Sequence, residues 1–419
     1  MRGALTSLAL LPLSLLTCFG ILGAGATAQT PAASPAGTRS TVMRVSEIAG
    51  IRRTEYPVHA RVPFAKSALK DAARIRLRAG TAALASQGAA EEKWDDGSVK
   101  WLALDFNLSI GPTETREIQI EYGDGVTLDS APPRGGLAIT ESADAIQVGS
   151  LKFTRAGSPL LLSAHYRYEY IGQGANGLVL VDASGKCFDW TGGSPALEIL
   201  KPGPLHVVLR YSGSVRLSDT YAVPVTLTLD MPNSKSWVKA TASVTDKERR
   251  VREILFETPF AFGAQPWLWD FGTDSGTYGV LRAPADMVVF QQLIDPKGGN
   301  AWTIETGQQG ALRGYEMSAS GRARTTAGWG HFQGPQAAVA FAIEDFSRVP
   351  GTHMVSFDGK GQATFRFVPA DPAASHSLSV YQHYVPTPVA IGAATNPSSM
   401  LNPLVVVLDR DHVQQSGVR

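Results

Sequence analysis

The chain has 419 residues, of which 44% are hydrophobic and 18% charged, and its 38 basic and 37 acidic side chains give a formal net charge of +1. Nucleic-acid-binding proteins present a basic face, so this near-neutral balance argues against a nucleic-acid partner. The charged fraction is below that of a typical globular chain, and 42 glycines and 26 prolines supply many turns. This composition favours an exported, all-β protein over a helical one.

The N-terminus has the features of a secretory signal peptide. A positive start at Arg2 precedes an apolar run from Leu5 to Ala24, and Ala26-Thr27-Ala28 forms a small-x-small cleavage site. We therefore expect residues 1–28 to be removed and the mature protein to be secreted or periplasmic. The apolar run is also long enough for a membrane anchor, and Cys18 offers a site for lipidation.

Residues 29–40 predict a disordered spacer because they are rich in Ala, Pro, Ser and Thr. No later apolar stretch approaches the length of a membrane span, so we expect no membrane contact after removal of the signal. Cys187 is the only cysteine after the signal, which excludes an internal disulfide. A single cysteine of this kind is most often a small buried hydrophobic residue.

Short apolar and alternating segments, bounded by Gly, Pro, Asn and Asp, dominate the remaining chain, and long helical periodicity is nearly absent. Many short strands separated by turns indicate sandwiches or barrels, so we predict an all-β fold. The predicted strands are Arg74–Arg78, Trp101–Ile110, Glu117–Tyr122, Ala145–Phe153, Leu205–Tyr211, Val225–Leu229, Val238–Val244, Ala337–Ile343, Ala363–Phe367 and Leu404–Leu408.

A stretch rich in Pro and Gly from Asp129 to Gly136 predicts a domain boundary. It separates a small barrel-like β domain, residues 41–128, from a large β-sandwich domain, residues 137–419. Strand-like alternation continues to about Leu408 without a second linker, which a single two-sheet sandwich accommodates.

The first domain contains the string Trp94-Asp95-Asp96-Gly97-Ser98-Val99-Lys100-Trp101. Before it come residues 50–58, 62–66 and the predicted strand 74–78, and after it comes Glu121-Tyr122-Gly123. This order resembles the N-terminal RIFT-barrel-like domain of the rhamnogalacturonan exolyase-like (PcRGLX/YetA-like) family, and the tryptophan-flanked string is its most specific part.

The resemblance implies a central β-sandwich and polysaccharide lyase-like β-elimination on a uronate-containing polysaccharide such as rhamnogalacturonan. Family members continue into a helical α/α toroid, which this chain is too short to contain. The resemblance therefore leaves open both catalysis and recognition of an acidic polysaccharide or oligosaccharide without turnover.

The same string also has a physical interpretation of its own. Asp96-Gly97 is a hairpin signal, and Trp94 and Trp101 flank the turn on the two strands. The tryptophans either pack as part of the hairpin or contact a sugar.

A polysaccharide lyase removes a proton next to a uronate carboxylate, so it needs a base and a cation or amide that stabilises the developing charge. Aromatic side chains would provide platforms for the sugar faces. In an extended Ser163–Tyr170, the side chains of His165, Arg167 and Glu169 would share one face. That face predicts either a catalytic or binding wall, with His165 as base and Arg167 against substrate, or a solvated surface.

The glycine-flanked stretch Thr326–Gly334 is the preferred candidate site, with Trp329 as a sugar platform and His331 as a proton carrier on the same face. The alternative is a packed tryptophan beside an exposed histidine. Tyr381–Tyr384 is a weaker group of the same kind, in which His383 is a catalytic candidate and Tyr384 a substrate-binding one.

Three further groups complete the predicted site. Trp267 and Trp269 lie on the same side of a strand, as in a carbohydrate surface or a core. Arg210 could bind a uronate carboxylate in a bidentate manner, with Tyr211 beside it as a catalytic candidate. The charged run Lys247–Arg252 is more typical of a solvated turn.

The sequence shows no support for a metal or another cofactor. The eight histidines are scattered, and none forms a close ligand pair with suitable partners. The sequence contains no nucleophile elbow and no phosphate loop, and no dinucleotide fingerprint stands between a predicted strand and a predicted helix. We therefore predict a lyase-like carbohydrate-active protein, with a non-catalytic binding or scaffold protein and an aldose-epimerase-like or glycosidase activity as alternatives.

Overall fold

The computed structural model describes residues 37–127, 135–191, 193–273, 277–308, 316–322, 326–371, 375–390, 392 and 395–418. The signal peptide, most of the predicted spacer and most of the predicted boundary stretch lie outside these ranges. The fold is all-β, as predicted, and the described residues contain only two short helices, α1 (Thr395–Leu401) and α2 (Arg410–Gln415). Among the described residues, no helix has the length and apolar character needed to cross a membrane.

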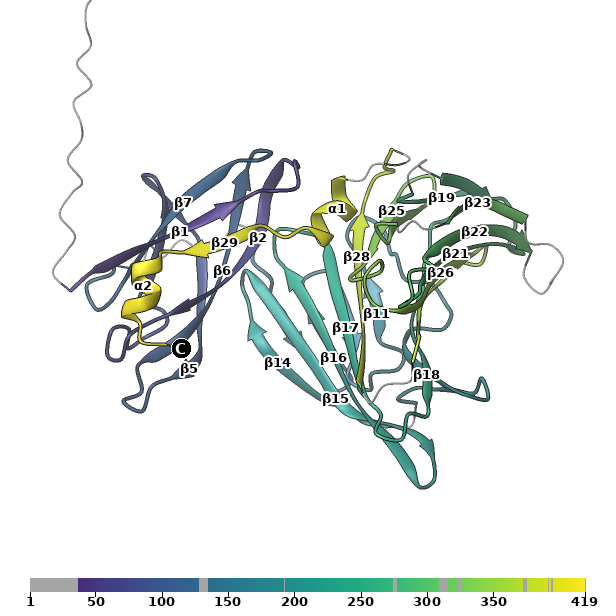
Figure 1. The fold of residues 1–419 in the computed structure, drawn as a ribbon, viewed down its shortest axis with the longest axis horizontal. Helices are drawn as coiled ribbons and strands as arrows, with labels where there is room; N and C mark the ends of the chain where they lie inside the picture. The colour runs from purple at the N-terminus through teal and green to yellow at the C-terminus, as the bar shows by residue number, and fades with distance from the viewer. Residues whose placement is uncertain are drawn as a thin grey trace, which may run out of the picture. The chain divides into compact units, whose positions relative to one another are not determined.

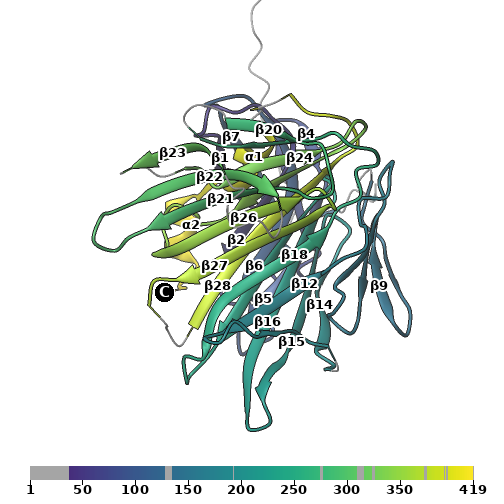
Figure 2. The same ribbon diagram turned by 90° about the vertical axis from the view of Figure 1, so that its right-hand side faces the viewer.

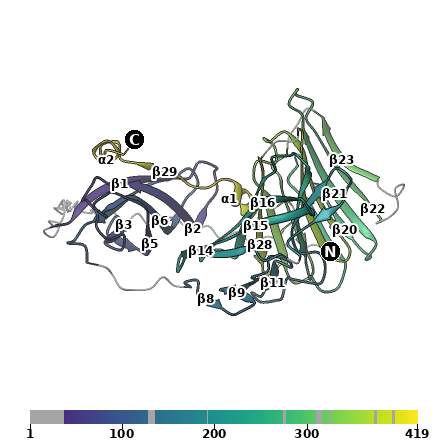
Figure 3. The ribbon, with the colours of Figure 1, turned by 90° about the horizontal axis from the view of Figure 1, so that it is seen from below.

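Two small sheets contain the strands of the N-terminal region (Figure 3). The first has the order β29 (Val405–Leu408), β1 (Arg39–Ser46), β7 (Thr115–Tyr122), β3 (Ile75–Ala79) and β4 (Ala82–Leu84). The second has the order β2 (Arg53–Pro63), β6 (Val99–Ile110) and β5 (Ser86–Lys93). The C-terminal strand β29 pairs with β1, so the range predicted as the sandwich domain also contributes a strand to this region.

The tryptophan-flanked string forms the hairpin between β5 and β6, as predicted. Gly97 has a φ of +83°, which favours glycine, and the Asp96 carboxylate accepts a hydrogen bond from the Ser98 backbone N–H at 3.0 Å. The indole of Trp94 donates to the Phe64 carbonyl at 3.0 Å, while Trp101 lies beneath the Arg61 guanidinium. These contacts support the structural interpretation of the string.

Two large sheets form the second region. The eight-stranded sheet has the order β13 (Cys187–Phe188), β12 (Gly177–Asp182), β18 (Val251–Pro259), β27 (Gln362–Pro369), β26 (Gly351–Asp358), β21 (Asp286–Ile294), β22 (Ala301–Gln308) and β23 (Glu316–Arg322), most of which Figure 2 labels. The nine-stranded sheet has the order β14 (Ala196–Pro202), β15 (His206–Ser218), β16 (Tyr221–Pro232), β17 (Trp237–Thr245), β28 (Ser375–Val385), β25 (Ala338–Ile343), β24 (Trp329–Gln333), β19 (Trp267–Phe271) and β20 (Thr277–Leu281) (Figure 1).

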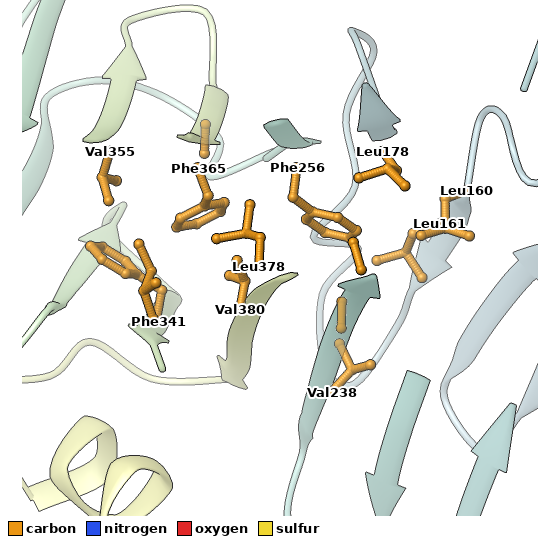
Figure 4. Packing of buried hydrophobic residues seen from close by; sticks show 14 of the residues in the cluster. Leu160, Leu161, Leu178, Val238, Phe256, Phe341, Val355, Phe365, Leu378 and Val380 are labelled. Carbon is orange, nitrogen blue, oxygen red and sulfur yellow. The ribbon is translucent and has the colours of Figure 1, made fainter. Parts of the chain in front are cut away.

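The inner faces of the two large sheets share one hydrophobic core (Figure 4). Phe365 of β27 and Phe341 of β25 meet edge to face with their ring centroids 5.3 Å apart. On β17, Val238, Ala240, Ala242 and Val244 are buried, whereas the residues between them point to the other face. This alternation is what makes the sequence fold as a two-sheet sandwich, because each strand buries every second side chain.

A small sheet of β11 (Leu161–Ala164), β10 (Leu151–Thr154), β9 (Ala145–Val148) and β8 (Ile139–Glu141) adjoins this core. The single strand predicted over Ala145–Phe153 is therefore wrong, because Gly149, with a φ of +56°, turns the chain between β9 and β10. Cys187 is an exposed free thiol at the start of β13, and the expectation of burial is also wrong.

Candidate functional site

A histidine–carboxylate pair projects from the sheet formed by β2, β6 and β5. His59 of β2 stands directly opposite Asp105 of β6, and the His59 Nδ1 lies 2.8 Å from the Asp105 Oδ1. Leu104 and Phe106 on either side of Asp105 face the hydrophobic core of the N-terminal region, so the alternation of the strand directs Asp105 to the opposite face. The Asp105 side chain is only 7% exposed, whereas that of His59 is 49% exposed.

The hairpin of β14 and β15 adds a lysine and a second histidine to this pair. The Lys201 Nζ donates to the Asp105 Oδ2 at 2.9 Å, and the His206 Nδ1 lies 2.9 Å from the Asp105 Oδ1. The Lys201 Nζ also approaches the Nδ1 atoms of His59 and His206, at 3.2 and 3.4 Å. The shorter contacts assign both histidine Nδ1 atoms as donors to Asp105, with the lysine ammonium packed between the rings.

His206 is held between two carboxylates. Its Nδ1 faces Asp105, and its Nε2 lies 2.7 Å from the Oδ1 of Asp230 on β16. Burial alone would lower the pKa of His206, but hydrogen bonds to Asp105 and Asp230 outweigh that effect and raise it to about 9. His206 is therefore an imidazolium at neutral pH and donates from both ring nitrogens.

Asp105 accepts hydrogen bonds from His59, Lys201 and His206. Burial by itself would raise the pKa of this carboxyl, but hydrogen bonds from His206 and His59 and the charge of Lys201 hold it well below its usual range. Asp105 is thus a permanent carboxylate that orients its neighbours. We name the five residues His59, Asp105, Lys201, His206 and Asp230 the junction cluster.

The junction cluster lines a cavity of about 390 Å³. Tyr56, Trp237 and Tyr381 contribute aromatic surface to the same cavity. The rings of Trp237 and Tyr381 lie 6.4 Å apart at nearly a right angle. A mostly apolar cavity with a few convergent polar groups is the usual form of a small-ligand site, and aromatic walls suit the faces of sugar rings.

A second lysine reaches this cavity from the nine-stranded sheet. Lys239 lies above the ring of Tyr381 at 5.2 Å and pairs with Glu344 at 2.7 Å. Burial raises the pKa of Tyr381, which therefore keeps its phenolic proton at neutral pH. The cavity accordingly offers two ammonium groups, a proton-bearing phenol and an oriented histidine.

His59 is the member of the cluster that is open to a ligand. Of the two ring nitrogens of His59, only Nδ1 has a hydrogen-bond partner among the described residues. In the neutral ring, the bond to Asp105 places the proton on Nδ1. Its Nε2 is then left with a free lone pair. This arrangement is that of a general base oriented by a carboxylate.

The cluster also contains a donor set suited to a metal ion. One ligand atom from each of His59, Asp105 and His206 lies within 4.8 Å of the others, and a two-histidine, one-carboxylate set fits zinc or another divalent transition metal. The Lys201 ammonium, however, lies within 3.4 Å of all three residues. A positive charge in this position already neutralises Asp105 and opposes a second cation.

The preferred sequence-predicted site lies elsewhere on the nine-stranded sheet. His331 is 1% exposed, and its Nδ1 is 2.7 Å from the Asp270 Oδ1, while Trp329 is 8% exposed and packs against it. His383 lies in the same row two strands away, because Ala340 of β25 is opposite His331 of β24 on one side and opposite His383 of β28 on the other. Burial, together with the charges of Lys235 and His331, lowers the pKa of His383 to about 4. These residues form a cluster, but they are not among those lining the described cavities.

The other predicted site residues divide into core and surface. Four aromatic residues are buried in the sandwich core, namely Tyr211, Trp267, Trp269 and Tyr384. His165 and Arg167 are exposed, with His165 3.9 Å from Glu169, and Arg210 pairs with Glu198. The structure therefore does not bring the five residues His165, Arg210, Trp329, His331 and His383 together in one cavity.

Sequence reasoning missed the junction cluster, because its members come from five strands. One signal was available. Asp105 is a lone acidic residue in the predicted apolar strand Trp101–Ile110, and a buried charge needs partners. The sequence did not reveal that those partners are the histidines at 59 and 206, which it shows as isolated.

Comparisons with known proteins bear on the fold. No family model matches the chain, and no curated protein matches it. A solved structure described as a protein in glycosyl hydrolase family 38 from Enterococcus faecalis superimposes with a TM-score of 0.51 at 8% identity, over 88% of this chain and 47% of that one. The chain thus spans about half the length of that protein and shares the fold of the matching part.

Two further solved structures superimpose more loosely. One is an alpha-mannosidase from Enterococcus faecalis V583, with a TM-score of 0.49 at 9% identity over 88% of this chain and 46% of that one. The other is a galactose mutarotase-related enzyme from Lactobacillus acidophilus, with a TM-score of 0.29 at 10% identity over 61% of this chain and 99% of that one.

Proposed function

We propose that the chain is an exported carbohydrate-active protein that binds a uronate-containing saccharide in the cavity of the junction cluster and cleaves it by β-elimination. The observation that carries this proposal is the convergence of an oriented histidine, two ammonium groups and three aromatic side chains on one cavity. The resemblance of the N-terminal region to the rhamnogalacturonan exolyase-like family supports the same class of substrate.

In the proposed reaction, the Nε2 of His59 takes the proton from C5 of the uronate. The electron pair of that C–H bond forms the C4=C5 double bond, and the C4–O bond breaks with its electrons going to the leaving oxygen. Tyr381, whose proton is retained through burial, protonates that oxygen. Lys201 and Lys239 face the carboxylate and stabilise the charge that develops on it.

The assay is the ultraviolet absorbance of the unsaturated uronate product, measured on rhamnogalacturonan, polygalacturonate and alginate. We expect His59→Ala to lower the rate by about a hundredfold or more, the usual loss when a general base is removed. His376→Ala is the matched control, because this histidine does not line the cavity and its ring lies 6.2 Å from that of Phe367. A flat trace on every uronate polymer would contradict the lyase.

Saccharide binding without cleavage is the second candidate function, and the hydrogen bonds within the junction cluster favour it. Lys201, His206 and Asp105 satisfy one another, so that little of their bonding capacity is left for a substrate. In a binding protein, oligosaccharide affinity would fall in Trp237→Ala, and no unsaturated product would form with any variant. Calorimetric titration together with the absorbance assay separates the two functions.

The export signal is part of the proposal. A fusion of residues 1–40 to a reporter that is active only outside the cytoplasm tests it. We expect activity with the native segment and its loss when charged residues interrupt the run from Leu5 to Ala24.

A further inference from the structure

A row of side chains across three strands of the nine-stranded sheet connects the cavity with an exposed face of that sheet. Asp230 of β16 pairs with Lys239 of β17, which in turn pairs with Tyr381 of β28. All three residues line the cavity. Because side chains two positions apart in a strand share a face, the next rows of these strands extend the same surface away from the cavity.

The next two rows of this surface consist only of hydroxyl residues. Thr228, Thr241 and Ser379 are directly opposite one another in register, and so are Thr226, Ser243 and Ser377. Most of them are partly or fully exposed, although Ser379 is 9% exposed and shares a hydrogen bond of 3.0 Å with Thr241. We name these six residues the hydroxyl face.

The hydroxyl face differs from an ordinary solvated sheet surface. The outward side chains of β18 and β27 in the other large sheet include Glu253, Glu257 and Arg366, with Glu253 and Arg366 paired at 3.3 Å. The six residues of the hydroxyl face carry no charge, and the first charged pair in the row of Thr228 is Arg210 and Glu198 on the neighbouring strands β15 and β14. An uncharged array of this kind suits a ligand that is itself rich in hydroxyl groups, because Ser and Thr hydroxyls both donate and accept hydrogen bonds.

We propose that the hydroxyl face binds the sugar units that follow the one held in the cavity, and that these units are uncharged. This inference rests on the proposed function and deepens it by naming the substrate as a saccharide chain with an acidic unit followed by neutral ones. Hydroxyls spaced about 5 Å across strands and about 7 Å along them both donate and accept hydrogen bonds, as sugar hydroxyls do.

The continuity with the cavity identifies the occupant. A chain bound with one unit between Tyr381 and Lys239 leaves the cavity over Thr241 and Thr228, because no other row intervenes on these strands. A protein partner would need an apolar centre in its contact surface, which the six hydroxyl residues do not offer.

The test compares oligosaccharides of increasing length by calorimetric titration. The variant is Thr226→Val, Thr228→Val and Thr241→Val together, which removes three hydroxyls and retains β-branched side chains that strands favour. The matched control is Thr303→Val, Thr352→Val and Thr364→Val, on the outward face of the eight-stranded sheet. The ligands are a disaccharide of one uronate and one neutral sugar, and longer oligosaccharides in which further neutral sugars follow the single uronate.

For the wild type and the control, we expect the longer oligomers to bind about tenfold tighter than the disaccharide, the gain from one to three hydrogen bonds. The variant should bind the disaccharide as the wild type does and lose the gain with length. Equal gains in variant and wild type would overturn the inference.

Binding of the disaccharide distinguishes failure of the hydroxyl-face inference from failure of the proposed function. If it binds and Tyr381→Ala weakens it, the cavity is a saccharide site, whatever the length dependence shows. If neither the disaccharide nor the longer oligomers bind the wild type, both proposals are overturned.

Discussion

The two histidine clusters of this protein use the same residue types with opposite electrostatic results. In the junction cluster, His206 lies between Asp105 and Asp230, and its pKa is raised to about 9. On the nine-stranded sheet, His383 is buried near Lys235 and His331, and its pKa is lowered to about 4. A histidine's chemistry is therefore set by its neighbours and its burial, and only the junction cluster combines charge with an open cavity.

Removing the carboxylate at the centre of the junction cluster should have the largest effect. Asp105→Ala leaves the partly buried Lys201 ammonium without its carboxylate and removes one of the two carboxylate partners of His206. Breaking such a network typically costs about 3–5 kcal/mol. Urea denaturation of wild type and variant measures the loss. The analogous change Asp270→Ala in the other cluster removes the hydrogen-bond partner of His331 and of the Gly392 backbone N–H, but it leaves no lysine without its carboxylate. It should therefore cost less, and an equal loss in both variants would break the comparison.

The pH dependence of stability should differ in sign between the clusters. For His206, the folded pKa of about 9 is above the unfolded value of about 6.5. Its stabilising contribution is complete below pH ~6.5 and is lost as the pH rises through ~9, by up to about 3 kcal/mol. His206→Gln should flatten the alkaline limb of the stability profile. An unchanged alkaline limb would show that this imidazole is neutral in the folded protein.

His383 should act at the acidic limb of the same profile. Its folded pKa of about 4 is below the unfolded value of about 6.5, so its neutral form stabilises the fold above pH ~6.5. That contribution is lost progressively as the pH falls toward ~4, by about 3 kcal/mol. His383→Phe should reduce the acid sensitivity, as followed by thermal melting from neutral to acidic pH, without changing the alkaline limb.

Much of the fold follows from local sequence. The Asp96-Gly97 turn and the alternating strands Val238–Val244 and Ala363–Phe367 depend on neighbouring residues, and both the turn and the strands occur where they were predicted. The hairpin at Gly149 was missed, since one glycine in an alternating run predicts either a turn or a weak strand position.

The junction cluster could not be predicted in the same way. It depends on the register between β2 and β6 and on the approach of the β14–β15 hairpin, both of which are set by tertiary packing. Aromatic residues and histidines near glycines are easy to find in a sequence, but Trp267 and Tyr384 show that the same residues also fill cores. Burial decides between these outcomes, and it is a property of the whole fold.

Replacing Lys201 should have the smallest effect on stability and would sharpen the comparison most. Lys201→Met keeps the length of the side chain and removes the ammonium that lies among His59, Asp105 and His206. Asp105 retains two histidine donors, so the loss in free energy of unfolding should be about 1 kcal/mol. The vacated position is surrounded by a two-histidine, one-carboxylate donor set.

We therefore expect Lys201→Met to bind Co²⁺ at least about tenfold more tightly than the wild type, with the visible absorption bands of a nitrogen- and oxygen-ligated ion. His59→Ala added to this variant should abolish the bands, because it removes one of the three ligands. Tight stoichiometric Co²⁺ binding by the wild type would show that the lysine yields its place to a metal. The ammonium would then be a substitute for the ion, and the chemistry of the cavity would rest on His59 as a ligand and not as a base.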